Sequence, residues 1–273
     1  MSSGDSPPSV HVVKVSKTGS TTLKTLTKEY GRAHPHGRKL IFNPHRASMP
    51  TILAEHPRDQ VVFFLRDPLA RFVSGFNSRL REGRNGDIPH SPAEKLAFSH
   101  FATPNDLAEA LSSEDNDVQD RALAAVASMM HSSMHYRDWV GDAEYLSRRL
   151  DRIAFVGMQE SFDADVRRFF ESLGWTRETE IAVYHQAPPS ASTFVSELAE
   201  KNLRAWYADD YELLEWVMAR RDRWAEGATL DPPLDDAERA RRQQEQRELR
   251  ADRRARRARR AAARETVQER PAG

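Results

Sequence analysis

The chain has 273 residues, and its 41 Lys and Arg are balanced by 41 Asp and Glu, so the formal net charge is zero. This length fits one large domain or two small ones and is enough to bury a core. The absence of cysteine excludes disulfides, thiolate metal sites and cysteine nucleophiles. No apolar run approaches the ~20 residues of a membrane helix, and the N-terminus lacks the pattern of a secretory signal. We therefore expect a soluble, cytoplasmic protein with no membrane span.

Charge is unevenly distributed along the chain. Residues 236–273 contain 13 Arg, no Lys and 7 acidic residues, a net charge of +6, so the preceding part carries −6. The tail is also rich in Ala, Glu and Gln, which favour helix. We expect a disordered N-terminus at 1–9, a globular domain at 10–233 and a charged helical tail at 234–273.

The globular part alternates between strand and helix patterns. We expect strands at 10–15, 39–42, 60–65 and 152–157, and helices at 23–30 (ended by Gly31), 49–56, 69–81, 163–173, 192–207 and 209–223. Gln60–Leu65 shows no polar alternation, which is typical of a parallel strand buried on both faces. The pattern predicts an α/β fold with a central parallel sheet of four or five strands and helices on both faces.

Two further regions are less regular. The polar residues 83–104, which include Gly and Pro, predict an exposed loop, and residues 105–150 predict two or three helices. His131 and His135 are expected four apart on one of these helices. That spacing can bind a metal, but no third ligand is evident, so lining of a substrate pocket is the better interpretation.

A loop with a lysine, a glycine and several hydroxyls separates the first strand from the first helix. Its residues are Lys17, Thr18, Gly19, Ser20, Thr21 and Thr22. Amides at the start of a helix have no partner within the helix and attract an anion, and glycine lets a ligand approach the backbone. The segment predicts a phosphate-type site, with an ordinary hydroxyl-capped turn as the alternative. It is not a Walker A sequence.

A second basic motif follows the strand at 60–65. Arg66 begins the run Arg-Asp-Pro-Leu-Ala-Arg-Phe-Val-Ser, which ends at Ser74. Ligands of open α/β sheets bind at the carboxyl ends of strands, and arginine binds phosphate with two parallel hydrogen bonds. Ser74, two turns into the next helix, can donate to the same ligand, and we expect Arg71 to pair with Asp67. The alternative is a capped helix with surface arginines.

Together, the two motifs resemble those of the sulfotransferases, most closely the carbohydrate-type members. Lys17–Thr22 resembles the family's 5′-phosphosulfate loop, and Arg66 with Ser74 resembles its 3′-phosphate motif. Phe155–Phe162 resembles a later strand and Glu-x-Phe turn of the family. The resemblance covers roughly residues 10–222 and departs from the commonest pattern where Gly19-Ser20-Thr21 replaces Gly-Gly-Thr.

The resemblance implies a P-loop-like three-layer fold and a sulfuryl donor, 3′-phosphoadenosine 5′-phosphosulfate (PAPS), with 3′-phosphoadenosine 5′-phosphate (PAP) as product and no metal required. It also implies that Lys17 stabilises the leaving phosphate oxygen and that Thr18–Thr22 hold the 5′-phosphosulfate. Arg66 and Ser74 would hold the 3′-phosphate. The family's adenine contacts fall in later loops, for which residues 185–193 are a candidate region.

A hydroxyl acceptor must lose a proton, and histidine is the commonest residue to take it. His45 is our choice of base, because it follows the second strand and should project from the same sheet edge as Lys17. The alternatives are a surface histidine without a role, or the carboxylate of Glu55 as base. The remaining histidines that could compete are His34, His36 and His56.

The acceptor is only broadly defined. A body of net charge −6 argues against a polyanionic polymer and favours a carbohydrate or small-molecule hydroxyl. We expect it to dock at residues 83–104 and 129–139. Core packing is the alternative for the large side chains there, which are Met129, Met130, Met134, Tyr136 and Trp139.

Other interpretations stay open. The Arg-rich tail can be a solvated helix, can bind an anionic partner such as nucleic acid or acidic lipid, or can contact another subunit. A P-loop-like nucleotide or small-molecule kinase is a competing function, although a Walker A lysine and a magnesium carboxylate are missing. A non-catalytic, sulfotransferase-like binding module is another.

Overall fold

Four parallel strands form the sheet at the centre of the fold. The computed structural model describes residues 8–33, 38–83, 86–175 and 191–225. The strands are β1 (Val10–Val13), β2 (Leu40–Phe42), β3 (Gln60–Leu65) and β4 (Ile153–Met158). Their order is β2-β1-β3-β4, and every neighbouring pair is parallel. The predicted central parallel sheet is therefore confirmed.

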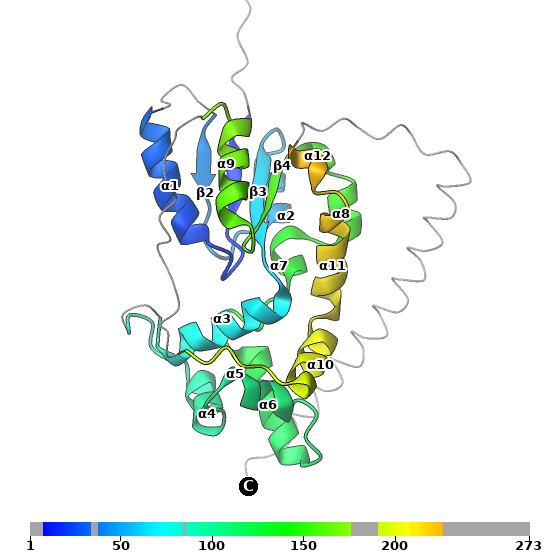
Figure 1. The fold of residues 1–273 in the computed structure, drawn as a ribbon. Coiled ribbons are helices and arrows are strands. Elements are labelled where there is room, and N and C mark those ends of the chain that lie inside the picture. The colour runs from blue at the N-terminus through cyan, green and yellow to red at the C-terminus, as the bar shows by residue number, and fades with distance from the viewer. Residues whose placement is uncertain (1–7, 34–37, 84–85, 176–190, 226–273) are drawn as a thin grey trace, which may run out of the picture. The chain divides into compact units, whose positions relative to one another are not determined.

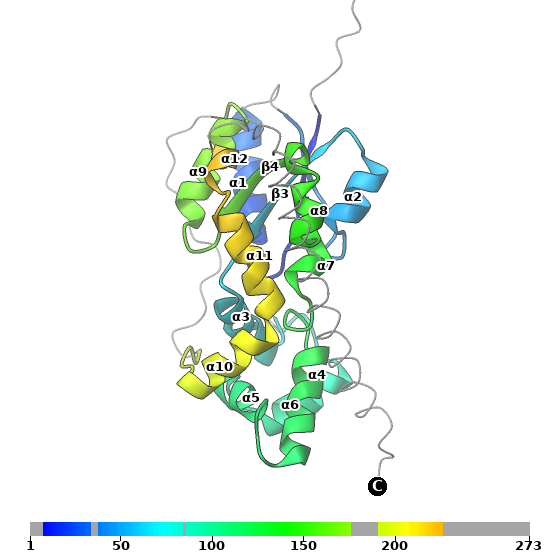
Figure 2. The same cartoon turned by 90° about the vertical axis from the view of Figure 1, so that its right-hand side faces the viewer.

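Helices cover both faces of the sheet, which makes the three layers that Figure 1 and Figure 2 show from two sides. One face carries α1 (Ser20–Ala33) and α9 (Phe162–Ser172). The other carries α2 (Met49–Glu55), α7 (Tyr136–Val140), α8 (Ala143–Ser147), α11 (Ala208–Met218) and α12 (Asp222–Ala225).

Successive side chains of β3 point to opposite faces of the sheet, so one apolar strand contributes to the hydrophobic packing on both faces. Val62 and Phe64 pack into the cluster under α1 and α9. Val61, Phe63 and Leu65 point the other way into the cluster under α2, α7 and α11. All five side chains are buried, so the prediction that this strand is covered on both faces is confirmed.

A separate group of helices lies beyond the carboxyl ends of the strands (Figure 1). It comprises α3 (Pro68–Leu80), α4 (Pro92–His100), α5 (Pro104–Ala110), α6 (Asn116–Ser128) and α10 (Glu197–Trp206). These helices share a third apolar cluster, which includes Phe72, Phe76 and Leu107. The edge where ligands of such sheets bind is thus faced by a helical layer.

Several expected boundaries were wrong, each for a local reason. Residues 83–104 contain α4, because Ser91 and Glu94 form a reciprocal capping box with Pro92 in the first turn. Helix α1 continues past Gly31, since one interior glycine costs only about 1 kcal/mol. Helix α10 begins at Glu197 rather than near 192, because the Ser196 side chain caps it.

The helix expected around His131 is also absent. Helix α6 ends at Ser128, and residues 131–135 form a turn and extended segment before α7, with His131 at φ 74°. Residues 1–7 of the expected N-terminal segment and the whole Arg-rich tail at 234–273 lie outside the described residues. In the ranges that the structure describes, no helix is long and apolar enough to cross a membrane.

Candidate functional site

The loop between β1 and α1 is shaped by two residues in the left-handed region of backbone space. Lys17 has φ 66° and Gly19 has φ 82°. The Thr18 hydroxyl donates to the Val15 carbonyl at 2.9 Å and pins the turn. Helix α1 then starts at Ser20 with no acidic residue in its first turn. Its N-terminal amides and macrodipole are therefore not offset by a nearby carboxylate on this helix, which suits an anion.

Gly19 lies where no side chain fits. A Cβ at this position would come within 2.5 Å of the Phe162 ring and 2.6 Å of Gln159 Oε1. The loop therefore packs directly on the turn between β4 and α9. Gln159 Oε1 is buried here and accepts no hydrogen bond from a described residue. A buried acceptor without a partner beside an anion-type loop is a group that a bound ligand with N–H or O–H donors can satisfy.

Arg66 enters the same region from the adjacent strand. It follows β3, which pairs with β1 in register Val13↔Phe63, and its Nη1 donates to the Lys17 carbonyl at 3.4 Å. The Tyr136 hydroxyl holds the Arg66 backbone by accepting from its N–H at 3.2 Å and donating to its carbonyl. Two cations predicted from separate motifs are thus brought together, one at the end of each strand.

The residue after Arg66 is fixed from three directions. The Asp67 amide donates to Glu160 Oε1 at 2.8 Å, and the Asp67 carboxylate accepts from the Ala70 amide at 2.8 Å as the N-cap of α3. The other carboxylate oxygen accepts from the Tyr211 hydroxyl at 3.0 Å. The Asp67 carboxylate is therefore hydrogen-bonded to the first turn of α3 and to α11, and it forms no ion pair with Arg66.

The pKa values of Lys17 and Arg66 are both lowered from their usual range. Burial, with Arg66 and Arg81 nearby, lowers the pKa of Lys17 to about 8. Burial also lowers the pKa of Arg66, against the opposing effect of Glu160. Among the described residues, neither side chain forms an ion pair with a carboxylate. Partly buried cations crowded together favour binding of an anion, which restores the charge balance that they lack.

Two histidines, His45 and His131, lie near lysine residues, His45 near Lys14 and His131 near Lys17. His45 is exposed, follows β2, and has its carbonyl held by the Trp139 indole N–H at 3.2 Å. Burial and Lys14 lower the pKa of His45. His131 is more enclosed. Burial is the largest cause that lowers its pKa to about 4, and the positive charges of Lys17, Arg79 and Arg71 lower it further. Both rings are therefore neutral at neutral pH and able to accept a proton or a hydrogen bond.

The Arg71 prediction was wrong, and the correction explains how His131 is held. Arg71 is fully buried and forms its ion pair with Asp210, Nη2 to Oδ2 at 3.2 Å, rather than with Asp67. Its guanidinium also donates to the carbonyls of His131 at 2.9 Å and Met134 at 3.0 Å. The helix-capping role of Asp67 made it unavailable to Arg71. Arg71 instead ties α3 to α11 and to the turn that carries His131.

The remaining predicted residues differ in where they lie. Thr18 and Thr22 are buried in the loop, Ser20 is partly buried and Thr21 is exposed. Ser74 is partly buried on α3, and its hydroxyl forms no hydrogen bond with another described residue. Contact between Ser74 and Arg66 is not part of the structure.

The other candidate bases are not brought to this edge. Glu55 and His56 end α2 and lie shortly before β3, at the amino end of that strand, whereas Lys17 and Arg66 follow carboxyl ends. His34, His36 and most of the adenine candidate region 185–193 are outside the described residues.

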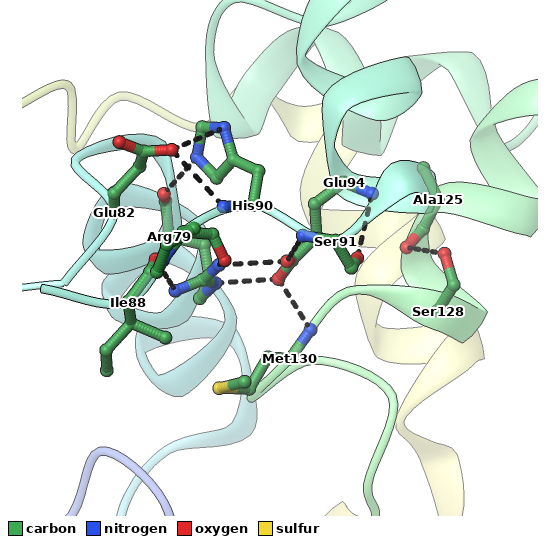
Figure 3. A network of polar contacts seen from close by, with 10 residues as sticks. Arg79, Glu82, Ile88, His90, Ser91, Glu94, Ala125, Ser128 and Met130 are labelled. Carbon is green, nitrogen blue, oxygen red and sulfur yellow. Dashed lines mark hydrogen bonds and ion pairs between the residues drawn. The ribbon is translucent and has the colours of Figure 1, made fainter. Parts of the chain in front are cut away.

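The side expected to receive the acceptor contains both core and surface residues. Met129, Tyr136 and Trp139 are buried, whereas Met130 is 44% exposed. Ile88, in the segment before α4, is 40% exposed. Figure 3 shows the Ile88 and Met130 side chains on the same side of the buried Arg79–Glu94 pair.

That pair holds the two segments in place. Arg79 contacts both carboxylate oxygens of Glu94, at 2.6 and 2.9 Å, and donates to the Ile88 carbonyl at 3.0 Å. Glu94 also accepts from the Met130 amide at 3.1 Å. Burial would raise the pKa of Glu94, but these hydrogen bonds, with one from the Ser91 amide, lower it to about 2. The network in Figure 3 is therefore a permanently charged anchor for this side of the site.

Sequence reasoning underrated three contributors. The sequence pattern allows acceptor docking or core packing for Tyr136, which also holds the Arg66 backbone, and the pattern gives no signal for Gln159. His131 was assigned to a helix. No local sequence signal marks a tyrosine as a backbone clamp or a histidine as a neighbour of Lys17, because each depends on a contact between distant parts of the chain.

The arrangement can bind a ligand with two separate anionic groups, one at the start of α1 beside Lys17 and one near Arg66. In a comparison with protein-family models, the model described as the sulfotransferase family matches residues 7–216. A comparison with curated proteins finds no match.

Proposed function

Since the chain belongs to the sulfotransferase family, we propose that it transfers a sulfuryl group from PAPS to a hydroxyl of a carbohydrate or small-molecule acceptor. Family membership supports sulfuryl transfer in general. The observation that carries the donor assignment is the pair Lys17 and Arg66, two partly buried cations without a carboxylate partner among the described residues, at the ends of adjacent strands.

The donor fits the chemistry of these residues. The 5′-phosphosulfate lies at the start of α1, where the amides and hydroxyls of Thr18–Thr22 hold it, and Gly19 allows the left-handed backbone turn of this loop against Phe162. Arg66 and Ser74 hold the 3′-phosphate, the Ser74 hydroxyl being free of other described partners. The unpartnered Gln159 Oε1 beside Gly19 adds an acceptor for a donor group of the same ligand.

The reaction is an in-line displacement at sulfur. The acceptor oxygen forms a bond to sulfur while the bond between sulfur and the bridging 5′-phosphate oxygen breaks, giving a sulfate ester and PAP. Lys17 stabilises the charge that grows on the bridging oxygen. His45 takes the proton of the acceptor hydroxyl, and its lowered pKa keeps it neutral at neutral pH. Catalysis then rests on positioning and electrostatics, with no metal required.

His131 adds a second neutral ring beside Lys17 and His45. A pKa of about 4 makes it a weak base, so its role is to accept a hydrogen bond from the acceptor and orient the hydroxyl toward sulfur. The exposed side chains of Ile88 and Met130 favour an acceptor with an apolar surface next to the hydroxyl, such as one face of a sugar ring.

Three features remain proposals on sequence grounds alone: a cytoplasmic location, the domain boundaries at 10–233, and a role of the Arg-rich tail in contacting an anionic partner or another subunit.

The donor assignment is tested by calorimetric titration of the full chain with PAP in EDTA, with AMP and ATP as controls. Tight PAP binding that depends on the 3′-phosphate and needs no metal supports the proposal. Binding of ATP with Mg²⁺ alone would replace it with a kinase. No nucleotide binding would replace it with a non-catalytic binding module.

The base is tested with His45→Ala, with His100→Ala as the matched control because His100 is exposed on α4. We expect His45→Ala to lower kcat by about 10²–10⁴-fold, the usual contribution of a general base, with PAP affinity retained. Unchanged turnover in His45→Ala would remove His45 as the base, and the same measurement on Glu55→Gln tests the alternative carboxylate.

A further inference from the structure

A second cluster of functional side chains lies at the other edge of the sheet. His11 of β1, His56 at the C-cap of α2 and Asp59 just before β3 each offer one ligand atom, and these atoms all lie within 4.8 Å of one another. The cluster is at the amino end of β3, so it is separate from the residues that follow the strands' carboxyl ends.

The distances within the cluster are those of a site that needs little adjustment to hold an ion. His11 Nε2 is 3.0 Å from Asp59 Oδ2, and His56 Nδ1 is 4.0 Å from the same oxygen. Ligand atoms about 2.1 Å from a tetrahedral zinc ion lie roughly 3.4 Å apart. The two separations bracket this value, and the His56 side chain, 47% exposed, has room to turn.

The hydrogen-bond partners of His11 suit a metal ligand. Asn43 Oδ1 and Nδ2 both lie 3.3 Å from His11 Nδ1, so Asn43 can pair with either tautomer of the ring. With the proton on Nδ1, donated to Asn43 Oδ1, the lone pair of Nε2 faces Asp59 Oδ2 at 3.0 Å. A metal ion can then lie between these two acceptors, whereas in the ion-free protein the other tautomer donates Nε2–H to the carboxylate.

The surroundings match the outer shell of a metal site. Metal-binding histidines usually donate their second ring nitrogen to an oxygen, and ligating carboxylates are themselves hydrogen-bonded. Asn43 supplies the first of these contacts, and the Ser9 amide donates to Asp59 Oδ1 at 3.0 Å for the second. The His11 ring is buried and stacks on His56 with centroids 4.6 Å apart, so His11 is held in orientation and the exposed His56 ring turns out of the stack to direct Nδ1 at the same ion.

We propose that His11, His56 and Asp59 form a structural binding site for a transition-metal ion of the Zn²⁺ class, with water as fourth ligand. Two imidazoles and one carboxylate are ligands that zinc accepts. A bound ion would tie β1, the end of α2 and the start of β3 together.

The test is titration of the EDTA-treated full chain with Zn²⁺ by calorimetry, with Co²⁺ absorption as a spectroscopic probe of tetrahedral coordination. We expect one ion per chain and a rise in Tm on zinc addition. His56→Ala and Asp59→Asn should each weaken binding by about tenfold or more, since loss of an outer-shell partner alone has that effect. His100→Ala, which removes an exposed histidine elsewhere, should bind as the unmodified chain does.

His56 is half exposed, so we expect His56→Ala to fold. A loss of zinc binding in this variant can then be attributed to the missing ligand. Absence of zinc binding, or binding that both His56→Ala and Asp59→Asn retain, would overturn the proposal, and a hydrogen bond from His11 Nε2–H would then explain the contact with Asp59. The outcome is independent of PAP binding, which is measured in EDTA.

Discussion

Two groups of buried cations differ sharply in their surroundings. At the carboxyl edge of the sheet, Lys17 and Arg66 lie together without an ion pair among the described residues. In the helical layer beyond it, Arg71 and Arg79 are at most 1% exposed. Each is paired with a carboxylate there and donates to two backbone carbonyls.

The difference distinguishes cations that stabilise the fold from cations that are available to bind a ligand. A buried charge that is paired with a carboxylate and hydrogen-bonded to backbone carbonyls fixes the segments that it contacts. A partly buried charge without a counter-ion is costly in the free protein and gains most from an anionic ligand. Arg71 and Arg79 hold the segments around His131, Ile88 and Met130 in place. Lys17 and Arg66 are left for the ligand.

The largest effect is expected from breaking a satisfied pair. Arg79→Met leaves Glu94 buried and unpaired, and removal of one partner of such a pair costs about 3–5 kcal/mol of unfolding free energy. Urea denaturation measures this loss. The double variant Arg79→Met/Glu94→Met should recover much of it, because an apolar pair of similar volume carries no buried charge. If Arg79→Met were as stable as the unmodified chain, the pair would not be an anchor.

Lys17→Met, in contrast to Arg79→Met, should lower activity without lowering stability. We expect kcat to fall by about 10²–10³-fold, the effect of losing one group that stabilises a developing oxyanion. Stability should be unchanged or higher, because an uncompensated charge is removed. Steady-state kinetics and thermal unfolding check the two halves. Lys24→Met, which removes an exposed lysine from α1, is the matched control.

A smaller effect is expected from pH. The pKa of Lys17 is about 8 in the free protein, and an anionic ligand favours the protonated ammonium. Below neutral pH Lys17 is already protonated in the free protein, so its titration should leave the PAP affinity nearly constant. Above pH 8 the PAP affinity should fall as pH rises, with a slope that approaches about tenfold per pH unit. Calorimetry at about pH 9 in buffers of different ionisation enthalpy should detect proton uptake, and Lys17→Met should abolish it. Affinity that stays constant through this range would contradict the assignment.

Much of the fold was predictable from local pattern. The residues of β3 carry no polar alternation, and this alone indicates a strand covered on both faces. The helices expected at 49–56 and 69–81 agree to within one residue with α2 and α3, each of which has a proline in its first turn. Helix α4 was missed because the polar residues around it suggested a loop, and the capping box at Ser91 and Glu94 was not recognised.

The site was predictable only in part. Lys17 and Arg66 follow strands, and parallel strands end at one edge, so their proximity could be expected. The partner of Arg71 could not, because Asp67 lies closer in sequence and Asp210 approaches only through the packing of α11. The same holds for the Tyr136 clamp on Arg66, since contacts between distant segments leave no periodic signal in the chain.

The most direct test of the central claim is thermal unfolding of the unmodified chain, Arg66→Met and Arg71→Met, each with and without saturating PAP. The account predicts that Arg66→Met unfolds at or above the Tm of the unmodified chain without ligand and loses most of the PAP-induced rise in Tm. Arg71→Met should unfold at a clearly lower temperature without ligand, since the buried Asp210 carboxylate loses its arginine partner. If Arg66→Met were destabilised without ligand and kept the full PAP-induced rise, Arg66 would be an architectural residue and the separation of the two groups would be wrong.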